Sequence, residues 1–293
     1  MAELVVAGSY NAALTVYSAT LPAPGETVVG SRFEQGPGGK GANQAIGARR
    51  LGADAFGDQA RSVLLAEGLP EHGITTDDQS PTGIALILVD DAGQNAISVA
   101  PGANASLSGP AVLDRFGPDL RDGKYLLMQL ECRAELAADL AAWARDAGCV
   151  SILNPAPARP LAPGALASFD IITPNEGELA TLAGSLGLAA GPADVLARQL
   201  VGYGVRDVVV TLAERGALWA CAAGVRYFDA YPVRAVDTTG AGDAFNAGLA
   251  AALVRGEPME AAIDHGCRAG AFCVTRNGVI DGLGYPADLE MLG

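Results

Sequence analysis

One stretch of the chain decides its fold: Ala235-Val236-Asp237-Thr238-Thr239-Gly240-Ala241-Gly242-Asp243-Ala244-Phe245-Asn246-Ala247-Gly248. A short apolar segment leads into a turn of small residues, and an alanine-rich helix is predicted to leave that turn. The first turn of a helix has backbone N–H groups without partners inside the helix, and the positive end of the helix dipole lies there too. The turn is therefore predicted to bind an anion, which Gly240 and Gly242 allow to approach the backbone closely.

Asp243 places a carboxylate beside this predicted anion site. A fixed negative charge weakens simple anion binding, but it is useful in phosphoryl transfer. There a carboxylate takes the proton from an attacking hydroxyl, while backbone N–H groups hold the phosphoryl group that moves. An ordinary helix capped by an aspartate after a glycine turn has the same pattern. These residues alone leave both interpretations open.

The composition of the 293 residues favours a folded α/β protein and argues against several classes of function. Half of the residues are hydrophobic and 18% are charged, which is typical of a chain with a large core. The formal net charge of −14 argues against a nucleic-acid partner, because a phosphate backbone needs a basic surface. The five cysteines have no C-x-x-C spacing and predict reduced thiols. No segment resembles a signal peptide or a membrane span, so we expect a cytoplasmic protein without a membrane partner.

Apolar runs and helical patterns alternate along much of the chain. Strands are predicted at 4–9, 125–131, 150–153, 171–176 and 207–212, a hairpin at 219–228, and helices at 134–147, from 177 onward, at 193–203, at 241–255 and at 260–274. This alternation predicts a parallel sheet with helices on both faces. Such sheets place their ligands where the strands end. Polar residues follow the predicted strand ends repeatedly, namely Asn11, Glu131, Asn154, Asn175, Glu176, Thr211 and Asp243.

Two further segments predict a small separate sheet. Residues 82–100 contain two extended runs around the turn Asp90–Asn95, and the chain near Val28 and Phe33 is predicted to be extended as well. A small sheet built from two excursions out of an α/β chain is typical of a lid over a binding site.

A glycine-rich stretch is predicted to open a helix that runs to about Arg50: Gly36-Pro37-Gly38-Gly39-Lys40-Gly41-Ala42-Asn43-Gln44-Ala45. It matches the dinucleotide pattern G-x-G-x-x-G, but the chain before it is polar and broken by proline instead of forming a buried strand. It is not a Walker A loop, because Gly41 follows Lys40 where that loop has Ser or Thr. A loop whose N–H groups, Lys40 and Asn43 reach a polyhydroxy ligand fits these residues, and so does a plain loop with Lys40 in solvent.

These motifs resemble the two signatures of the ribokinase-like (phosphofructokinase B) sugar kinases, with the ribokinase branch the nearest. The signatures fall at residues 38–45 and 237–245, and shorter matches extend the resemblance over nearly the whole chain, at Pro24–Thr27, Met128–Glu131, Asn154–Ala158 and Thr173–Glu178. The resemblance implies an α/β three-layer sandwich with a central, mostly parallel sheet and a small β-sheet lid. It implies a single domain over residues 1–293, with lid strands from about 14–36 and 82–104.

The resemblance also implies a function and a set of site residues. ATP would phosphorylate the terminal hydroxyl of a sugar, with D-ribose to ribose 5-phosphate as the expected reaction. Mg²⁺ would accompany ATP, K⁺ would bind nearby, and a homodimer would form through the lid. Asp243 would be the general base, with Gly240, Ala241 and Gly242 forming the anion hole. The other implied residues are Asn11, Gly39, Lys40, Asn43, Glu131 and Asp243 for the sugar; Asn175, Thr211, Ala213, Gly216, Gly242 and Cys267 for ATP; Glu178 for Mg²⁺ through water; and Asp237, Thr239, Val274 and Gly278 for the monovalent cation.

Some positions depart from the family pattern. Ala13 stands where the family has an aspartate that accepts two hydroxyl hydrogen bonds, a loss of about 1–3 kcal/mol for each bond. A strand of about ten residues is missing between Ala53 and Asp54, which would expose a sheet edge. Ala213 replaces a usual glycine, and Cys267 replaces a histidine at the adenine. Two alternatives stay open: a kinase for another small ligand (a ketose, a sugar acid or a nucleoside), and a degenerate, non-catalytic homologue that only binds sugar or nucleotide.

Overall fold

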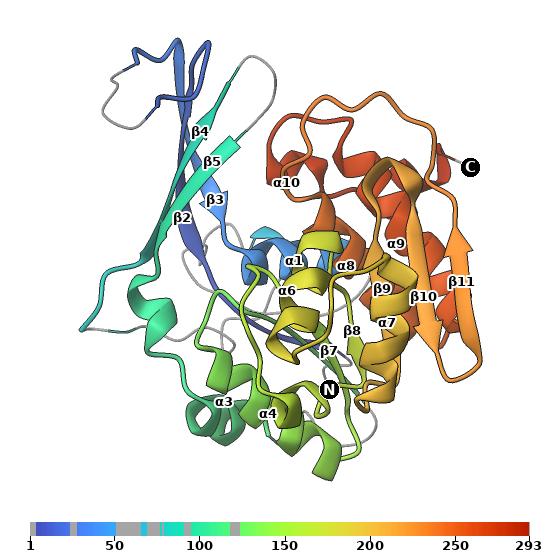
Figure 1. Ribbon diagram of the computed structural model, residues 1–293. Helices are drawn as coiled ribbons and strands as arrows, with labels where there is room; N and C mark the ends of the chain where they lie inside the picture. The colour runs from blue at the N-terminus through green and yellow to red at the C-terminus, as the bar shows by residue number, and fades with distance from the viewer. Residues whose placement is uncertain are drawn as a thin grey trace.

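The computed structural model describes residues 4–23, 28–50, 66–68, 77, 79–90, 95–117 and 124–292. Its main body is a seven-stranded sheet with helices on both faces (Figure 1). Neighbouring strands are parallel except at β10, which is antiparallel to both β9 and β11. Across the sheet the order is β1 (Leu4–Ala7), β6 (Tyr125–Gln129), β7 (Val150–Asn154), β8 (Ile171–Ile172), β9 (Asp207–Thr211), β10 (Ala217–Cys221) and β11 (Gly224–Phe228).

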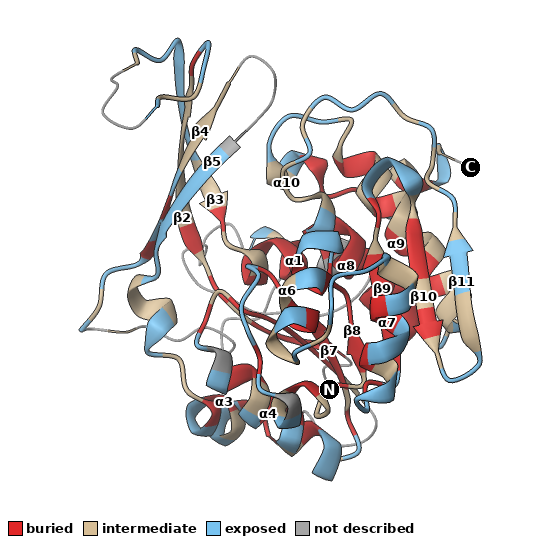
Figure 2. Cartoon of the chain, viewed as in Figure 1, coloured by how far each residue is buried: buried red, intermediate tan, exposed pale blue. Residues whose placement is uncertain are grey.

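Alternate residues of the strands pack into two separate cores, which gives the protein three layers. Val5 and Leu126 belong to one core, which lies under α3 (Gly109–Phe116), α4 (Ala134–Asp146), α6 (Glu176–Ser185) and α7 (Ala193–Gly202). Leu4 and Leu127 belong to the other, which lies under α1 (Lys40–Arg50), α8 (Ala241–Val254) and α9 (Met259–Cys273). Figure 2 shows the inner strands buried between the helices. The sheet and its two helical layers confirm the predicted fold class.

Shorter elements complete the fold, and the predicted helices agree closely with α4, α7, α8 and α9. The short helices are α5 (Pro163–Leu166), α10 (Val279–Gly282) and α11 (Pro286–Glu290), with 3₁₀ turns η2 (Gly102–Ala105) and η3 (Ala213–Arg215). Across the described ranges, none of the helices combines the length and the apolar character that crossing a bilayer requires.

Helices α1 and α8 lie against each other in the same direction. Asn43 hydrogen-bonds to Asp243, and one turn later Gly47 faces Ala247. A Cβ added at Gly47 would lie 2.7 Å from the Cβ of Ala247, which is closer than side-chain atoms pack. Alanine and glycine make up six of the eleven buried residues of α8, and at this contact the small side chain of Ala247 faces Gly47. This close contact fixes the first turns of both helices against each other.

A second sheet of four strands stands beside the main body (Figure 1). Its strand order is β3 (Arg32–Gly38), β2 (Asn11–Tyr17), β4 (Gly83–Val89) and β5 (Asn95–Ala100). Strand β2 is antiparallel to β3 and parallel to β4, and β5 is antiparallel to β4. This confirms the small sheet predicted from the sequence.

Four local predictions differ from the structure, and two fall outside it. The strand predicted at 171–176 ends at Ile172 as β8, and α6 begins at Glu176. The strand predicted near Val28 is wrong, because residues 28–30 have no regular structure. Residues 36–38, predicted as a loop, belong to β3, because their backbone pairs with β2 from Asn11↔Gly38 onward, and this pairing overrides the weak strand preference of glycine and proline. Asn11 opens β2 instead of trailing β1. The missing strand after Ala53 and the match at 24–27 lie outside the described residues.

Candidate active site

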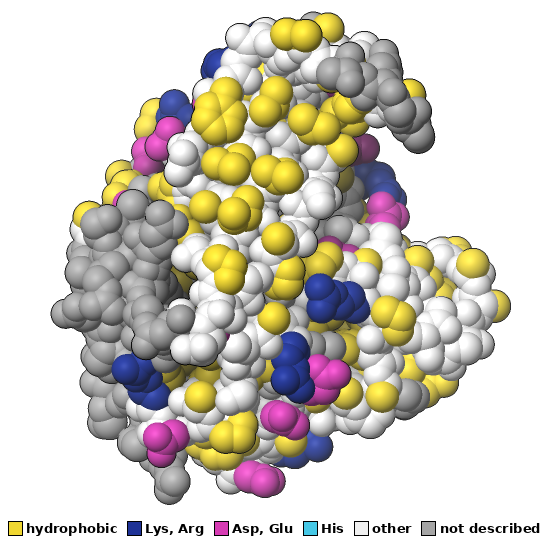
Figure 3. Space-filling model, turned by 90° about the vertical axis from the view of Figure 1, so that its left-hand side faces the viewer, with side chains coloured by type: hydrophobic (Ala, Val, Ile, Leu, Met, Phe, Trp, Pro, Cys, Tyr) yellow, Lys and Arg dark blue, Asp and Glu magenta, His cyan; other side chains and the backbone are white. Residues whose placement is uncertain are grey.

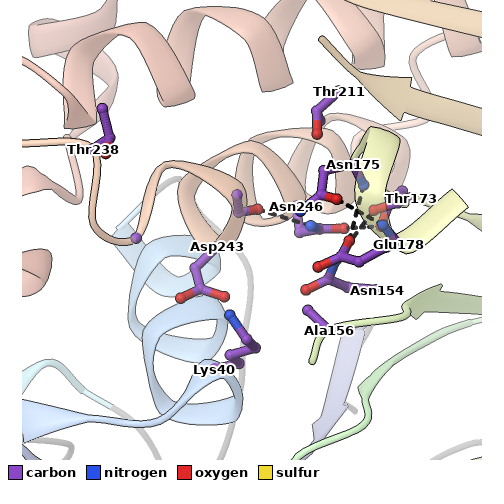
Figure 4. Close-up of a pocket in the computed structure, with 12 residues that line it drawn as sticks. Lys40, Asn154, Ala156, Thr173, Asn175, Glu178, Thr211, Thr238, Asp243 and Asn246 are labelled. Atoms are coloured by element: carbon purple, nitrogen blue, oxygen red, sulfur yellow. Dashed lines mark hydrogen bonds between the residues drawn. The ribbon is translucent and has the colours of Figure 1, made fainter. Parts of the chain in front are cut away.

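A pocket lies at the carboxyl ends of the parallel strands, between the first turns of α1, α6 and α8 (Figure 4). This is the edge at which parallel α/β sheets bind their ligands. The lining consists of Lys40, Asn154, Ala156, Thr173, Asn175, Glu178, Thr211, Thr238, Gly240, Gly242, Asp243 and Asn246. The sequence motifs therefore converge on one place from three helices and from the ends of β7, β8 and β9.

Helix α8 begins at this pocket, and its first turn offers unpaired donors. Gly240 is the N-cap, with a φ of 82° that favours glycine. The N–H of Ala241 donates to the carbonyl of Thr238 at 3.3 Å. Among the described residues, the N–H groups of Gly242 and Asp243 have no acceptor. An anion at the start of α8 would supply that acceptor, as the sequence predicts.

Asp243 is buried, with 4% of its surface exposed, and two amides hold its two oxygens. The Nδ2 of Asn43 donates to Oδ2 at 2.8 Å, and the Nε2 of Gln44 donates to Oδ1 at 3.1 Å. Burial raises the pKa of Asp243, whereas the charge of Lys40 and the two amide donors act against that rise. Lys40 points toward Asp243 in Figure 4, and the charge of Asp243 raises the pKa of Lys40. A carboxylate held in this way next to unpaired N–H groups has the surroundings that a general base needs.

Glu131 follows β6 and collects three donors on one carboxylate oxygen. The N–H of Lys40 donates to Oε2 at 2.9 Å, the Nδ2 of Asn11 donates at 3.4 Å, and the hydroxyl of Ser9 donates as well. These bonds join the starts of α1 and β2 to the end of β6.

The Oδ1 of Asn43 is buried and has no partner among the described residues. A ligand hydroxyl can donate to this oxygen.

Glu178 enters the pocket from α6. Asn175 caps this helix: its Oδ1 accepts from the N–H of Glu178 at 2.8 Å, and the Oε2 of Glu178 accepts from the N–H of Asn175 at 2.9 Å. Burial raises the pKa of Glu178. Within the described ranges, no cluster of three or more His, Cys, Asp or Glu side chains could hold a metal. One carboxylate facing a pocket fits a Mg²⁺ ion that arrives with most of its ligands from phosphates and water.

The four residues predicted at a monovalent cation come together from two segments, the one before α8 and the one after α9. The Oδ1 of Asp237 accepts from the N–H of Thr239 at 2.9 Å, and its Oδ2 accepts from the N–H of Gly278 at 3.1 Å. The carbonyl of Val274 accepts from the N–H groups of Val236 at 2.7 Å and Asp237 at 3.3 Å. A carbonyl oxygen has two lone pairs. The Val274 carbonyl is therefore fully used by the backbone, and Asp237 and the carbonyl of Thr239 are the better ligands for a cation.

The remaining predicted residues surround the pocket without all lining it. Thr211 lies in the lining, whereas Ala213 and Gly216, at the two ends of the turn η3, do not. Cys267 lies on α9 outside the lining, and burial raises the pKa of its thiol to about 12. Gly39, with a φ of 92°, joins β3 to α1.

Sequence reasoning did not single out several polar residues of the site. The Oγ1 of Thr173 donates to the Oδ1 of Asn246 at 2.6 Å, and the Nδ2 of Asn246 donates to the carbonyl of Gly242 at 2.8 Å. These bonds tie the first turn of α8 to the end of β8. The available signal was their position inside the quoted stretches 173–178 and 235–248. Gln44 and Thr238, and the apolar Ala156, also lie inside quoted stretches and were missed.

Comparisons with known proteins agree with this architecture. The family model for pfkB family carbohydrate kinases matches residues 1–284. A ribokinase from Haemophilus influenzae is 36% identical over 288 residues, which cover 94% of this chain and 93% of that protein. The crystal structure of a ribokinase from Thermotoga maritima has a TM-score of 0.87 at 32% identity, covering 100% of this chain and 99% of the other. A structure of Arabidopsis thaliana ribokinase complexed with ribose and ATP has a TM-score of 0.82 at 29% identity, covering 99% and 98%.

Proposed function

Because this chain belongs to the pfkB family of carbohydrate kinases, we propose that it transfers the γ-phosphoryl group of ATP to the terminal hydroxyl of D-ribose. The products are ribose 5-phosphate and ADP. One observation carries the proposal: the buried carboxylate of Asp243 lies beside the unpaired N–H groups of Gly242 and Asp243 at the start of α8. A carboxylate repels an anion that is only bound, but it is needed where a hydroxyl must lose its proton beside that anion.

In the proposed step, the hydroxyl oxygen of the sugar bonds to the γ-phosphorus while its proton passes to Asp243. The bond from the γ-phosphorus to the bridging oxygen breaks, and that oxygen leaves with ADP. The N–H groups of Gly242 and Asp243 donate to the phosphoryl oxygens, with Gly240 and Ala241 shaping the turn. Lys40 adds a positive charge next to the carboxylate.

We assign the two substrates to opposite sides of Asp243. The sugar lies toward α1, where Gly39, Lys40, Asn43 and Glu131 border it together with Asn11, and the unpaired Oδ1 of Asn43 supports this side. The nucleotide lies toward α6 and β9, next to Asn175 and Thr211, with Ala213, Gly216 and Cys267 farther out.

Two cations complete the proposed site. Glu178 would hold Mg²⁺ through water, and the ion would neutralise charge on the phosphates of ATP. A K⁺ ion would bind at Asp237 and Thr239, with Val274 and Gly278 shaping the loop. The support for the second ion is the convergence of these residues next to the start of α8.

We further propose that the small sheet is a lid and that two copies of the chain pair through its outer face. The register places Leu14 beside Leu86, and Val16 beside Phe33, on one face of this sheet. Leu86 is 54% exposed and Phe33 is 61% exposed. Figure 3 looks at this side of the molecule and shows hydrophobic side chains gathered over the sheet. Exposed apolar surface of this kind is typical of an interface between proteins.

Two broader proposals follow from the same features. The whole chain, residues 1–293, would act as one domain, with the small sheet as part of it. The five cysteines are all free, which supports a reducing compartment, the cytoplasm.

An ATP-consumption screen tests the proposed reaction. Purified protein with Mg²⁺ and K⁺ would be offered ribose, 2-deoxyribose, fructose, 2-keto-3-deoxygluconate, adenosine and inosine. Turnover with ribose supports the proposal. Ala13 favours a second candidate, because its methyl group cannot bond to sugar hydroxyls, and turnover only with another acceptor would identify that ligand as the substrate. ATP binding without turnover on any acceptor would overturn the catalytic proposal.

A further inference from the structure

Gln44 connects the proposed base to a chain of buried amides. The side chain is fully buried on α1, directly after Asn43. Its Nε2 donates to the Oδ1 of Asp243 at 3.1 Å and to the Oδ1 of Asn154 at 3.0 Å. Its Oε1 accepts from the Nε2 of Gln129. Both hydrogens and the oxygen of this amide are therefore used.

One backbone carbonyl fixes the direction of this chain. The Nδ2 of Asn154 donates to the carbonyl of Thr173 at 3.1 Å, and a carbonyl can only accept. Asn154 must therefore turn its nitrogen to Thr173 and its oxygen to Gln44. Gln44 in turn must present its nitrogen to Asn154, and that nitrogen also reaches Asp243. A rotated Gln44 amide would place its oxygen against two acceptor oxygens.

The second amide on Asp243 is not fixed in this way. The Oδ1 of Asn43 has no partner among the described residues, so only the bond to the carboxylate itself turns the Nδ2 toward Asp243. This oxygen can accept from a ligand while the Nδ2 keeps its bond to Asp243, whereas Gln44 cannot rotate without breaking its bonds to both Asn154 and Asp243. The two oxygens of Asp243 therefore have different surroundings: Oδ1 faces a donor that other protein groups fix, and Oδ2 faces a donor whose amide can also bond to a ligand.

We propose that Gln44 is a positioning residue for phosphoryl transfer, which holds Oδ1 of Asp243 so that the carboxylate stays ionised and presents Oδ2 to the acceptor hydroxyl. This inference rests on the proposed role of Asp243 as the general base. A neutral donor favours the charged form of a buried carboxylate. It does so without adding a positive charge that would itself bind the phosphoryl group. Burial raises the pKa of Asp243, and the hydrogen bond from Gln44 works against that rise.

A pair of methionine variants tests this role by the dependence of kcat on pH. Gln44→Met keeps the length of the side chain and removes the donor to Asp243. Gln129→Met is the matched control, because it also removes a buried amide that bonds to Gln44 but does not touch Asp243. For Gln44→Met we expect kcat to fall about tenfold near pH 7 and the acidic limb of the profile to move up by about one pH unit, because a charged carboxylate has lost a donor. The KM for ATP should stay within about twofold.

The control separates positioning from stability. Gln129→Met should lower the melting temperature by about as much as Gln44→Met does. The pH of its acidic limb should equal that of the parent protein. If Gln44→Met also leaves the limb unmoved, Gln44 is only a core residue and the proposal is wrong.

A second variant covers the case in which Gln44→Met does not fold. Gln44→Glu keeps the size of the side chain and, when ionised, sets a second carboxylate against Asp243, so kcat near pH 8 should fall about tenfold or more. A rate within about twofold of the parent would overturn the proposal. Failure of the proposed function is seen elsewhere: in a parent protein that consumes no ATP with any acceptor, or in an Asp243→Asn variant that keeps its rate.

Discussion

Replacing Asp243 by asparagine should remove phosphoryl transfer and leave the fold intact. Asp243→Asn keeps the shape of the side chain and removes the charge that accepts the proton of the attacking hydroxyl. A positioned general base contributes about 10²- to 10⁴-fold to a rate. That range corresponds to about 3–5 kcal/mol of transition-state stabilisation, and we expect kcat to fall by this factor.

The cost in stability is expected to be small, because the site can accept an amide. Gln44 has a fixed donor on Oδ1, so the new amide must present its oxygen there. Its nitrogen then faces Asn43, whose Oδ1 has no partner in the described part of the chain and can rotate to accept. Both hydrogen bonds are kept, so the free energy of unfolding should change by about 1 kcal/mol or less; a donor left unpaired would cost about 1–3 kcal/mol.

Three measurements check these expectations: kcat and KM from ADP release, ATP affinity by calorimetry, and the free energy of unfolding in urea. ATP affinity should stay within about threefold or improve, because a negative charge beside the phosphates is gone. Asp170→Asn is the control, since Asp170 precedes β8 at the opposite edge of the sheet and accepts from Ser151 at 2.8 and 2.9 Å. It should lower stability and leave kcat unchanged. An Asp243→Asn enzyme within about tenfold of the parent kcat would refute the base role, and a large loss of stability would refute the rotation of Asn43.

Three further outcomes follow from the structure. Burial raises the pKa of Asp243 above its ordinary 3.8, so the ionised base is lost as the pH falls through the raised value. The kcat of the parent should therefore begin to decline at a pH above 3.8, and a flat profile down to that pH would contradict this. Gly47→Ala should lower the free energy of unfolding in urea by about 1–3 kcal/mol because its Cβ meets α8 at 2.7 Å, whereas Gly184→Ala, with open space around it, should not. Leu86→Glu should convert the proposed dimers to monomers, as measured by sedimentation velocity. Val195→Glu on α7, where Val195 is 44% exposed, is the control and should leave the dimers intact. Dimers of the Leu86→Glu variant would place the interface elsewhere.

Local patterns in the sequence were sufficient to predict the main body of the fold. Helix α8 could be predicted because a glycine turn precedes an alanine-rich run, and both signals lie within a few neighbouring residues. The place of Asp243 in the first turn of α8 could be predicted for the same reason, because Gly240 and Gly242 lie beside it in the sequence. The capping pair Asn175 and Glu178 was not predicted as such. Where the contacts that form an element are local, residue type and spacing are sufficient to predict that element.

The pairing of β3 with β2 and the buried contacts of Gln44 could not be predicted. Strand β3 contains Gly36 and Pro37, and only the backbone pairing with β2 makes it a strand. Gln44 looks like an ordinary helix residue in the sequence, because its partners Gln129, Asn154 and Asp243 are 85, 110 and 199 residues away. A buried amide has no sequence signature, because its hydrogen-bond partners depend on which groups the fold brings next to it.

The contact of Gly47 with Ala247 has a consequence for redesign of this enzyme. The proposed base and its two amides belong to helices that pack in direct contact, while Asn11 and Ala13 belong to β2 of the other sheet. Substitutions on β2 should therefore alter which acceptor enters without disturbing Asp243 and its two donors. A mutant library confined to β2 and β3 should retain most folded members and vary mainly in acceptor choice, whereas a library that includes the α1–α8 contact should lose most of its members to misfolding.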